Sequence, residues 1–216
     1  MGDLERWSVQ IVKDFSEPGW FHIPSQMNSA EAAAWVDSAL TQVKRFVGAP
    51  RWDGSPTPES MLRELLEYGV ADEPVLPSVA TFQVWPVAGP AVLTCRVCLV
   101  DRGSVPDFTE VDDAAIHIVV SDELGTGIQF STKSLVEEAG GEATLHSVDL
   151  IFADDDAAMV FSLEQSFPAL VAGAMPGLDV LKNVFRVVRP DGQKFNAHAP
   201  ANVLNEKPWE LANDAR

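Results

Sequence analysis

The sequence predicts an α+β fold, an antiparallel sheet flanked by helices, and two observations carry this prediction. Apolar residues recur at helical spacing near the N-terminus and again near residue 180, whereas between about residues 79 and 163 they alternate with polar ones. Such alternation gives one buried and one wetter face, which is typical of an antiparallel sheet. Because helices precede the strands and another helix follows them, the order favours α+β over a doubly wound fold.

The first expected elements are a short strand and two helices. Residues 20–24 suggest a strand that ends at a proline. Asn28, with a glutamate three residues on, has the spacing of a capping box, and the apolar residues behind it predict a helix over residues 29–47. After a loop rich in glycine and proline, Thr57 is expected to cap a second helix, which Gly69 would end.

The middle of the chain predicts strands and the region after it a third helix. The strand candidates are residues 79–85, 91–100, 115–120, 126–130, 144–152 and 159–163. Helical spacing returns at residue 167, but Pro176 and Gly177 are expected to break it, so the predicted helix covers residues 176–186. We expect one domain over residues 1–189 and a C-terminal tail over residues 190–216, partly packed or flexible.

The charge is strongly acidic and unevenly distributed. The chain has 32 Asp and Glu against 15 Lys and Arg, a net charge of −17, and residues 73–165 account for −13 of it. Nucleic acids and anionic membranes are therefore disfavoured as partners, since both bind through clustered Lys and Arg. The excess is either a solvated surface that favours solubility or a surface that meets a basic protein partner.

Several features predict a cytoplasmic protein. The N-terminus lacks the basic and apolar segments of a signal peptide, and no apolar run approaches the roughly 18–20 residues that span a bilayer. Cys95 and Cys98 are three residues apart on an expected strand, which puts their side chains on opposite faces and their Cα atoms roughly 10 Å apart. A disulfide or zinc site is disfavoured by this spacing, and buried, reduced thiols are expected.

No motif for catalysis or nucleotide binding is present, so no catalytic residue, metal or cofactor is assigned. Gly-x-Ser-x-Gly, the phosphate-binding loop and the dinucleotide fingerprint are all absent from the sequence. His117 and His146 both fall on expected strands and could meet beside Asp113 or Asp149 as an acid–base or metal site. The other interpretation is that each is a hydrogen-bonded structural histidine.

The candidate binding residues are exposed aromatic and acidic side chains. Two tryptophans lie in expected loop or tail segments, where aromatic residues often anchor partners. Three consecutive aspartates, Asp154 to Asp156, occupy the turn of the last hairpin, where aspartate is favoured by turn chemistry but could also hold a hard cation. The candidates are Trp52, Trp209, Asp112, Asp113, Asp154, Asp155 and Asp156.

The order of these elements resembles a known family. The Trp-Phe-His-Ile-Pro entry at residues 20–24, the Leu-Arg-Glu-Leu-Leu helix at residues 62–66, and the closing hairpin and helix over residues 148–188 look like the PsbP-like fold. That group includes the extrinsic photosystem subunit, the Ran-release factors and the EagR-type secretion chaperones, with uncharacterised actinobacterial members. The resemblance, over about residues 18–190, implies a protein-binding module on a helix-flanked sheet.

Three functional hypotheses follow from the sequence. The first is a non-enzymatic intracellular adaptor or chaperone-like protein with a basic partner, which agrees with the absent motifs, the acidic region and the resemblance. The second is a small-molecule or metal-dependent enzyme that uses His117 and His146 with a nearby aspartate. The third is a structural, oligomer-forming subunit.

Overall fold

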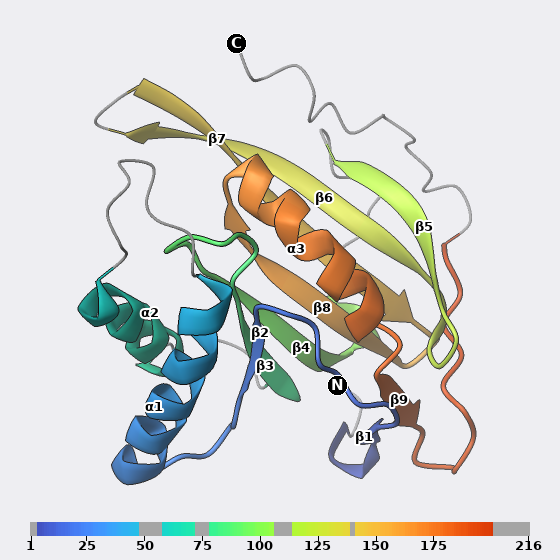
Figure 1. Ribbon diagram of the computed structural model, residues 1–216. Coiled ribbons are helices and arrows are strands. Elements are labelled where there is room, and N and C mark those ends of the chain that lie inside the picture. Colours follow the sequence, from blue (N-terminus) through green and yellow to red (C-terminus); the bar gives the residue numbers. More distant parts are fainter. Residues whose placement is uncertain (1–3, 48–57, 72–77, 106–113, 139–140, 201–216) are drawn as a thin grey trace.

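The computed structural model describes residues 4–47, 58–71, 78–105, 114–138 and 141–200. Within these ranges the chain forms a seven-stranded antiparallel sheet in the order β2-β3-β4-β8-β7-β6-β5, a two-stranded sheet of β1 and β9, and three α-helices (Figure 1), which confirms the predicted α+β class. The elements are β1 (Ser8–Ile11), β2 (Trp20–Ile23), α1 (Ser29–Phe46), α2 (Glu59–Ala71), β3 (Ala80–Val84), β4 (Leu93–Asp101), β5 (Ala115–Ser121), β6 (Gly125–Glu138), β7 (Gly141–Ala153), β8 (Ala157–Ser166), α3 (Pro168–Leu181) and β9 (Phe185–Val188).

Helix α1 begins at the predicted capping box. The Asn28 side chain accepts hydrogen bonds from the backbone N–H groups of Ala30 and Glu31, and the Glu31 carboxylate accepts one from the Asn28 N–H. These bonds satisfy amide groups that the first turn of a helix leaves without partners. The buried side of α1 packs on α2 and on Trp85 through Val36, Ala39, Leu40 and Val43.

Helix α2 continues past the predicted end at Gly69, as far as Ala71. The glycine is needed for a close contact rather than for a helix end. A Cβ at residue 69 would lie 2.5 Å from Nε2 of Gln83, and that amide donates to the Leu65 carbonyl at 2.6 Å. This contact joins α2 to β3. Thr57, the predicted cap, lies outside the described residues.

The predicted helix over residues 176–186 is wrong in its bounds. The helix runs from Pro168 to Leu181, with Pro176 inside it, and Phe185 begins strand β9. Pro176 cannot donate an intrahelical hydrogen bond. Four buried residues on one side hold the helix against the sheet regardless: Val171, Ala174, Leu178 and Leu181.

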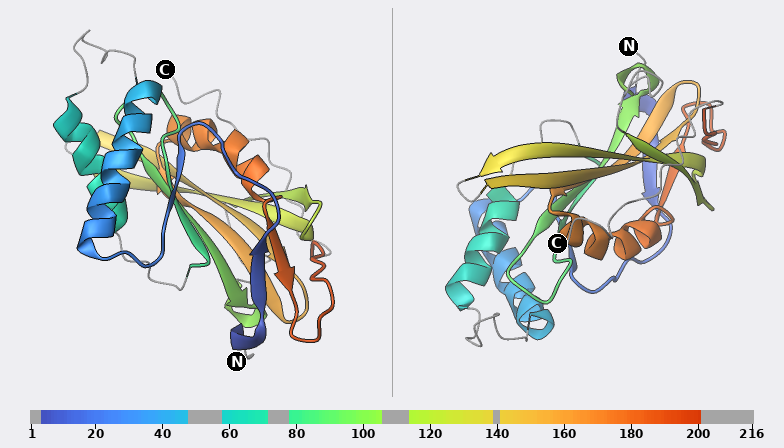
Figure 2. Two further views of the ribbon diagram at one scale, coloured as in Figure 1. Left: turned by 60° about the horizontal axis from the view of Figure 1, so that its bottom comes forward. Right: turned by 90° about the horizontal axis from the view of Figure 1, so that it is seen from above.

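The main core lies between α3 and one face of the sheet (Figure 2), where Phe82, Leu150 and Phe161 are buried among the α3 side chains. The neighbouring residues on these strands point to the other face, because side chains alternate along a strand. Two other clusters of described residues cover parts of that opposite face. Helices α1 and α2 pack there around Trp85, next to β3, and a smaller apolar cluster lies around Ile128, Ile151 and Ala158. Each face of the sheet is therefore partly covered by helices, α3 on one side and α1 with α2 on the other.

Strands β6 and β7 are longer than predicted and project beyond their neighbours (Figure 1). Pairing of β6 with β5 stops at Ser131, and pairing of β7 with β8 stops at His146. Within the described part of the chain, residues 132–138 and 141–145 consequently pair only with each other. We call these two segments the hairpin arm.

The described part of the predicted C-terminal tail packs against the sheet. Phe195 is fully buried, and the Ala197 N–H donates to the Leu124 carbonyl while the Thr126 N–H donates to the Ala197 carbonyl. Residues beyond 200, including Trp209, lie outside the described ranges. None of the helices in the described part of the chain is both long enough and apolar enough to cross a membrane.

Candidate functional site

The aspartate triplet forms the β7–β8 turn, as the turn interpretation predicted. Oδ1 of Asp154 accepts from the backbone N–H groups of Asp156 and Ala157, each at 2.9 Å. Asp154 is buried, whereas Asp155 and Asp156 are exposed. An aspartate that accepts from the backbone two and three residues on stabilises a tight turn without help from a ligand.

Arg189, which directly follows β9, binds this turn. Its guanidinium donates to Oδ2 of Asp154 and to Oδ2 of Asp156, and its Nε lies 3.9 Å from Asp191. The guanidinium also lies over the Trp7 ring, 5.2 Å from the ring centroid. Because one guanidinium joins two carboxylates, it offsets half of the combined charge of Asp154 and Asp156 within the fold.

The neighbouring β5–β6 turn is compensated in the same way. Nε of Arg186 donates to Glu123 at 2.8 Å, and this hydrogen bond lowers the pKa of Glu123 against the opposing effect of desolvation. Lys13 lies 3.6 Å from the Asp122 carboxylate, and Lys194 donates to the Asp122 carbonyl. We call the β5–β6 and β7–β8 turns, with these partners, the latched end.

Two hollows flank the β7–β8 turn, and both are lined by Arg102 and Asp155. The first, about 370 Å³, has an apolar floor that includes Ile128 and Ile151, with His198 3.5 Å from Asp155 at its side. The second, about 600 Å³, lies beside Trp7 and the Arg189 guanidinium. Both hollows mix arginine with aspartate, and no group of three His, Cys, Asp or Glu among the described residues is arranged to hold a metal ion.

His117 and His146 do not form a shared site. His117 pairs with Gln129 on one side of β6, and His146 pairs with Lys133 on the other side. Two strand spacings across the sheet and four residues along it separate the histidines by about 16 Å. His146 is buried and pairs with Ser166, the last residue of β8, whereas Asp149 pairs with Ser162 further along the same two strands. The structure therefore does not bring together the group that the enzyme hypothesis needs.

Cys95 and Cys98 are free and buried, on opposite faces of β4, as predicted. Burial is the main cause that raises the pKa of both thiols, so both stay protonated at neutral pH.

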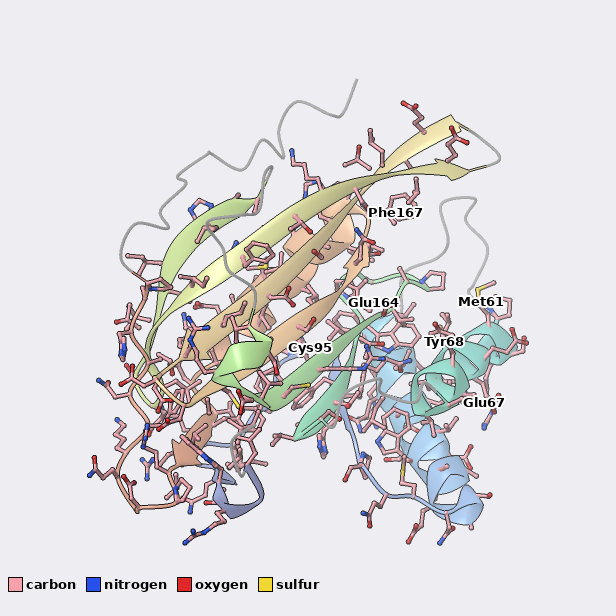
Figure 3. All side chains as sticks on the ribbon, turned by 180° about the vertical axis from the view of Figure 1, so that it is seen from behind. Met61, Glu67, Tyr68, Cys95, Glu164 and Phe167 are labelled. Atoms are coloured by element: carbon pink, nitrogen blue, oxygen red, sulfur yellow. The ribbon has the colours of Figure 1, made fainter. Side chains whose placement is uncertain are left out.

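A row of polar residues crosses the sheet face opposite α3, and the sequence did not reveal it. Asp149 on β7 pairs with Ser162 on β8, which pairs with Arg96 on β4. Burial raises the pKa of Asp149, and the hydrogen bond from Ser162 opposes this effect. Figure 3 views the molecule from this side and shows Glu164, which accepts from the Thr94 N–H at 2.8 Å. Only the register of three strands brings these residues into one row.

The hairpin arm is the second acid-rich region of the described structure. Glu137 and Glu142 pair directly across the two strands, and both are exposed. Neither has an ion-pair partner among the described residues, and Lys133 is the only basic residue in segment 132–145. On the same face Leu135 is 71% exposed, the highest value for a large apolar side chain in the described residues. Like charges in register oppose folding, so this arrangement is not explained by stability.

Four of the predicted binding residues fall outside the described ranges. They are Trp52, Asp112, Asp113 and Trp209. Asp154, Asp155 and Asp156 are brought together, but two of the three are engaged by Arg189.

Comparison with known proteins adds no relative from which a role could be transferred. The chain matches no protein-family model, no curated protein and no solved structure.

Proposed function

We propose that the protein is a non-enzymatic binding module, an adaptor or chaperone-like protein, whose hairpin arm contacts a partner with a basic surface. One observation carries the proposal: the cross-strand pair Glu137 and Glu142, without a cation, beside the exposed Leu135. An apolar centre with a charged rim is the usual composition of a protein contact. A basic partner would remove the repulsion between the two glutamates.

The net charge supports the same proposal. A protein of net charge −17 attracts a basic partner over the distance of a Debye length and accelerates their encounter. The resemblance to the PsbP-like fold, whose recognised members are mostly protein-binding modules, points in the same direction. As part of this proposal the protein works in the cytoplasm, where the buried thiols of Cys95 and Cys98 stay reduced.

Co-purification from the native host with three baits tests this function. The baits are the parent chain, the arm variant Glu137→Gln/Glu142→Gln, and the matched variant Asp14→Asn/Glu67→Gln, which loses the same charge from exposed residues elsewhere. We expect a basic protein to be enriched with the parent and the matched variant and lost with the arm variant. If no basic protein is enriched, or if all three baits recover it equally, the proposal is wrong.

A further inference from the structure

The two edges of the seven-stranded sheet differ in how they are closed. The β2 edge is only four residues long and is followed by Pro24. The indole N–H of Trp35 donates to the His22 carbonyl at 2.9 Å, so a side chain of α1 occupies a main-chain acceptor on this strand. Short length, proline and a covering element are the devices by which proteins close a sheet edge.

In the described part of the chain, the β5 edge shows none of these devices. Its seven residues, Ala-Ile-His-Ile-Val-Val-Ser, include no proline, lysine or arginine, and the strand pairs with β6 without a bulge. Among the described residues, the backbone of Ala115–Ser121 pairs only with β6. Ile118 is 50% exposed and Val120 is 59% exposed on the same face. An uncharged, regular and partly apolar edge is a template for one more strand.

The net charge of the chain favours a basic partner over a second copy of the chain at the β5 edge. A second copy of the chain would bring another net charge of −17 against the first, and this repulsion opposes pairing of β5 with β5. An extended segment of a positively charged chain meets attraction instead, because the net charge of the chain is strongly negative. Main-chain hydrogen bonds supply affinity in this mode without a large interface.

We infer that an extended segment of a basic partner adds to the sheet as an eighth strand beside β5. This inference rests on the proposed function and specifies how the partner is bound. The apolar side chains of such a segment would lie beside Ile118 and Val120, and its basic residues would lie at the ends of the strand.

Hydrogen exchange with a defined peptide tests the inference. The probe is Lys-Lys-Val-Thr-Val-Thr-Val-Lys-Lys, and its control carries proline at the central valine, which keeps the charge but prevents strand pairing. With the probe at about ten times its Kd, the β5 amides that do not donate to β6 should exchange about tenfold more slowly, while β2 amides should not change. Equal protection by the proline peptide, or no protection of β5, would overturn the inference.

A pair of variants separates this inference from the proposed function. Val120→Lys introduces a charge of the kind that closes natural sheet edges, and Val180→Lys makes the same change on the exposed side of α3. We expect Val120→Lys to weaken binding of the co-purified partner at least tenfold relative to Val180→Lys. If that partner binds both variants equally, the strand-addition inference fails while the proposed function stands. If no basic partner is recovered, the proposed function fails, whether or not the peptide protects the β5 amides from exchange.

Light scattering tests the competing occupant. If the parent chain forms dimers as concentration rises, and Val120→Lys but not Val180→Lys abolishes them, then β5 pairs with a second copy and the inference is overturned. We expect a monomer for the parent and for both variants.

Discussion

The latched end and the hairpin arm are both rich in acid, and they use it differently. At the latched end, Arg189 binds Asp154 and Asp156, and Arg186 binds Glu123. On the arm, Glu137 and Glu142 face each other without a cation among the described residues. Acidic residues at the first region are held by ion pairs within the fold, whereas those at the second are exposed and repel each other. Composition alone does not separate these two roles.

Removing the arginine at the latched end should have the largest effect on stability. Arg189→Met leaves the buried carboxylate of Asp154 without its cation and removes the contact with the Trp7 ring. Loss of charge-assisted hydrogen bonds of this kind costs about 2 kcal/mol, which corresponds to a decrease of about 5 °C in Tm for a chain of this size. Thermal unfolding followed by circular dichroism measures it.

Arg63→Met is the matched control, because it breaks the exposed ion pair with Asp37 that joins α2 to α1. Exposed ion pairs contribute little to stability. A decrease in Tm for Arg189→Met no larger than for Arg63→Met would contradict the distinction between a structural latch and an ordinary surface pair.

The sequence predicted the features that depend on neighbouring residues, but not the contacts between residues that are far apart in the chain. The capping box at Asn28, the last hairpin and its aspartate turn depend on neighbouring residues, and all three are confirmed. Arg189 lies 35 residues from Asp154, so no local pattern could assign the pair. The pairing of β1 with β9 escaped prediction for the same reason, since both strands are short and far apart in sequence.

The arm and the third helix were missed for physical reasons of a different kind. Strand β6 continues through the polar residues 131–134, where the apolar alternation on which the prediction depended fades. Helix α3 tolerates Pro176 because its buried side packs against the sheet, so tertiary contacts override the local propensity. The charge count over residues 73–165 misled in part, because Arg186 and Arg189, which lie outside that range, bind acidic residues of the two turns.

On the hairpin arm, removing a charge should raise the free energy of unfolding, whereas removing a charge at the latched end should lower it. Glu142→Gln removes the repulsion with Glu137, and we expect the free energy of unfolding to rise by about 0.5 kcal/mol and Tm by about 1 °C. Urea unfolding of the parent, Glu142→Gln and Asp156→Asn provides the comparison. Asp156→Asn removes one partner of Arg189 and should destabilise. Equal signs for the two variants would show that the arm and the latched end do not differ in this way.

The smallest expected effect on stability comes from Asp149, which lies in neither the latched end nor the hairpin arm. Because burial raises its pKa in the folded state, the folded chain binds its proton more tightly than the unfolded chain. Stability from this group is therefore present below the unfolded pKa and declines as pH rises through the folded pKa. Asp149→Asn should stabilise the protein near pH 7 and lose this advantage near pH 4.

Denaturant unfolding across that pH range checks the prediction, with Asp14→Asn as the exposed control that removes the same charge. An advantage of Asp149→Asn that grows toward acid pH would reverse the expected sign.

The most direct measurement of the central claim is the association rate constant with the co-purified basic protein, for the arm variant Glu137→Gln/Glu142→Gln and the matched variant Asp14→Asn/Glu67→Gln. Both lose two charges, so the overall attraction is the same and only the position differs. Between about 50 and 300 mM NaCl, we predict slower association for the arm variant at low salt and convergence of the two rates at high salt. Equal rates at every salt concentration would contradict a binding role for the arm.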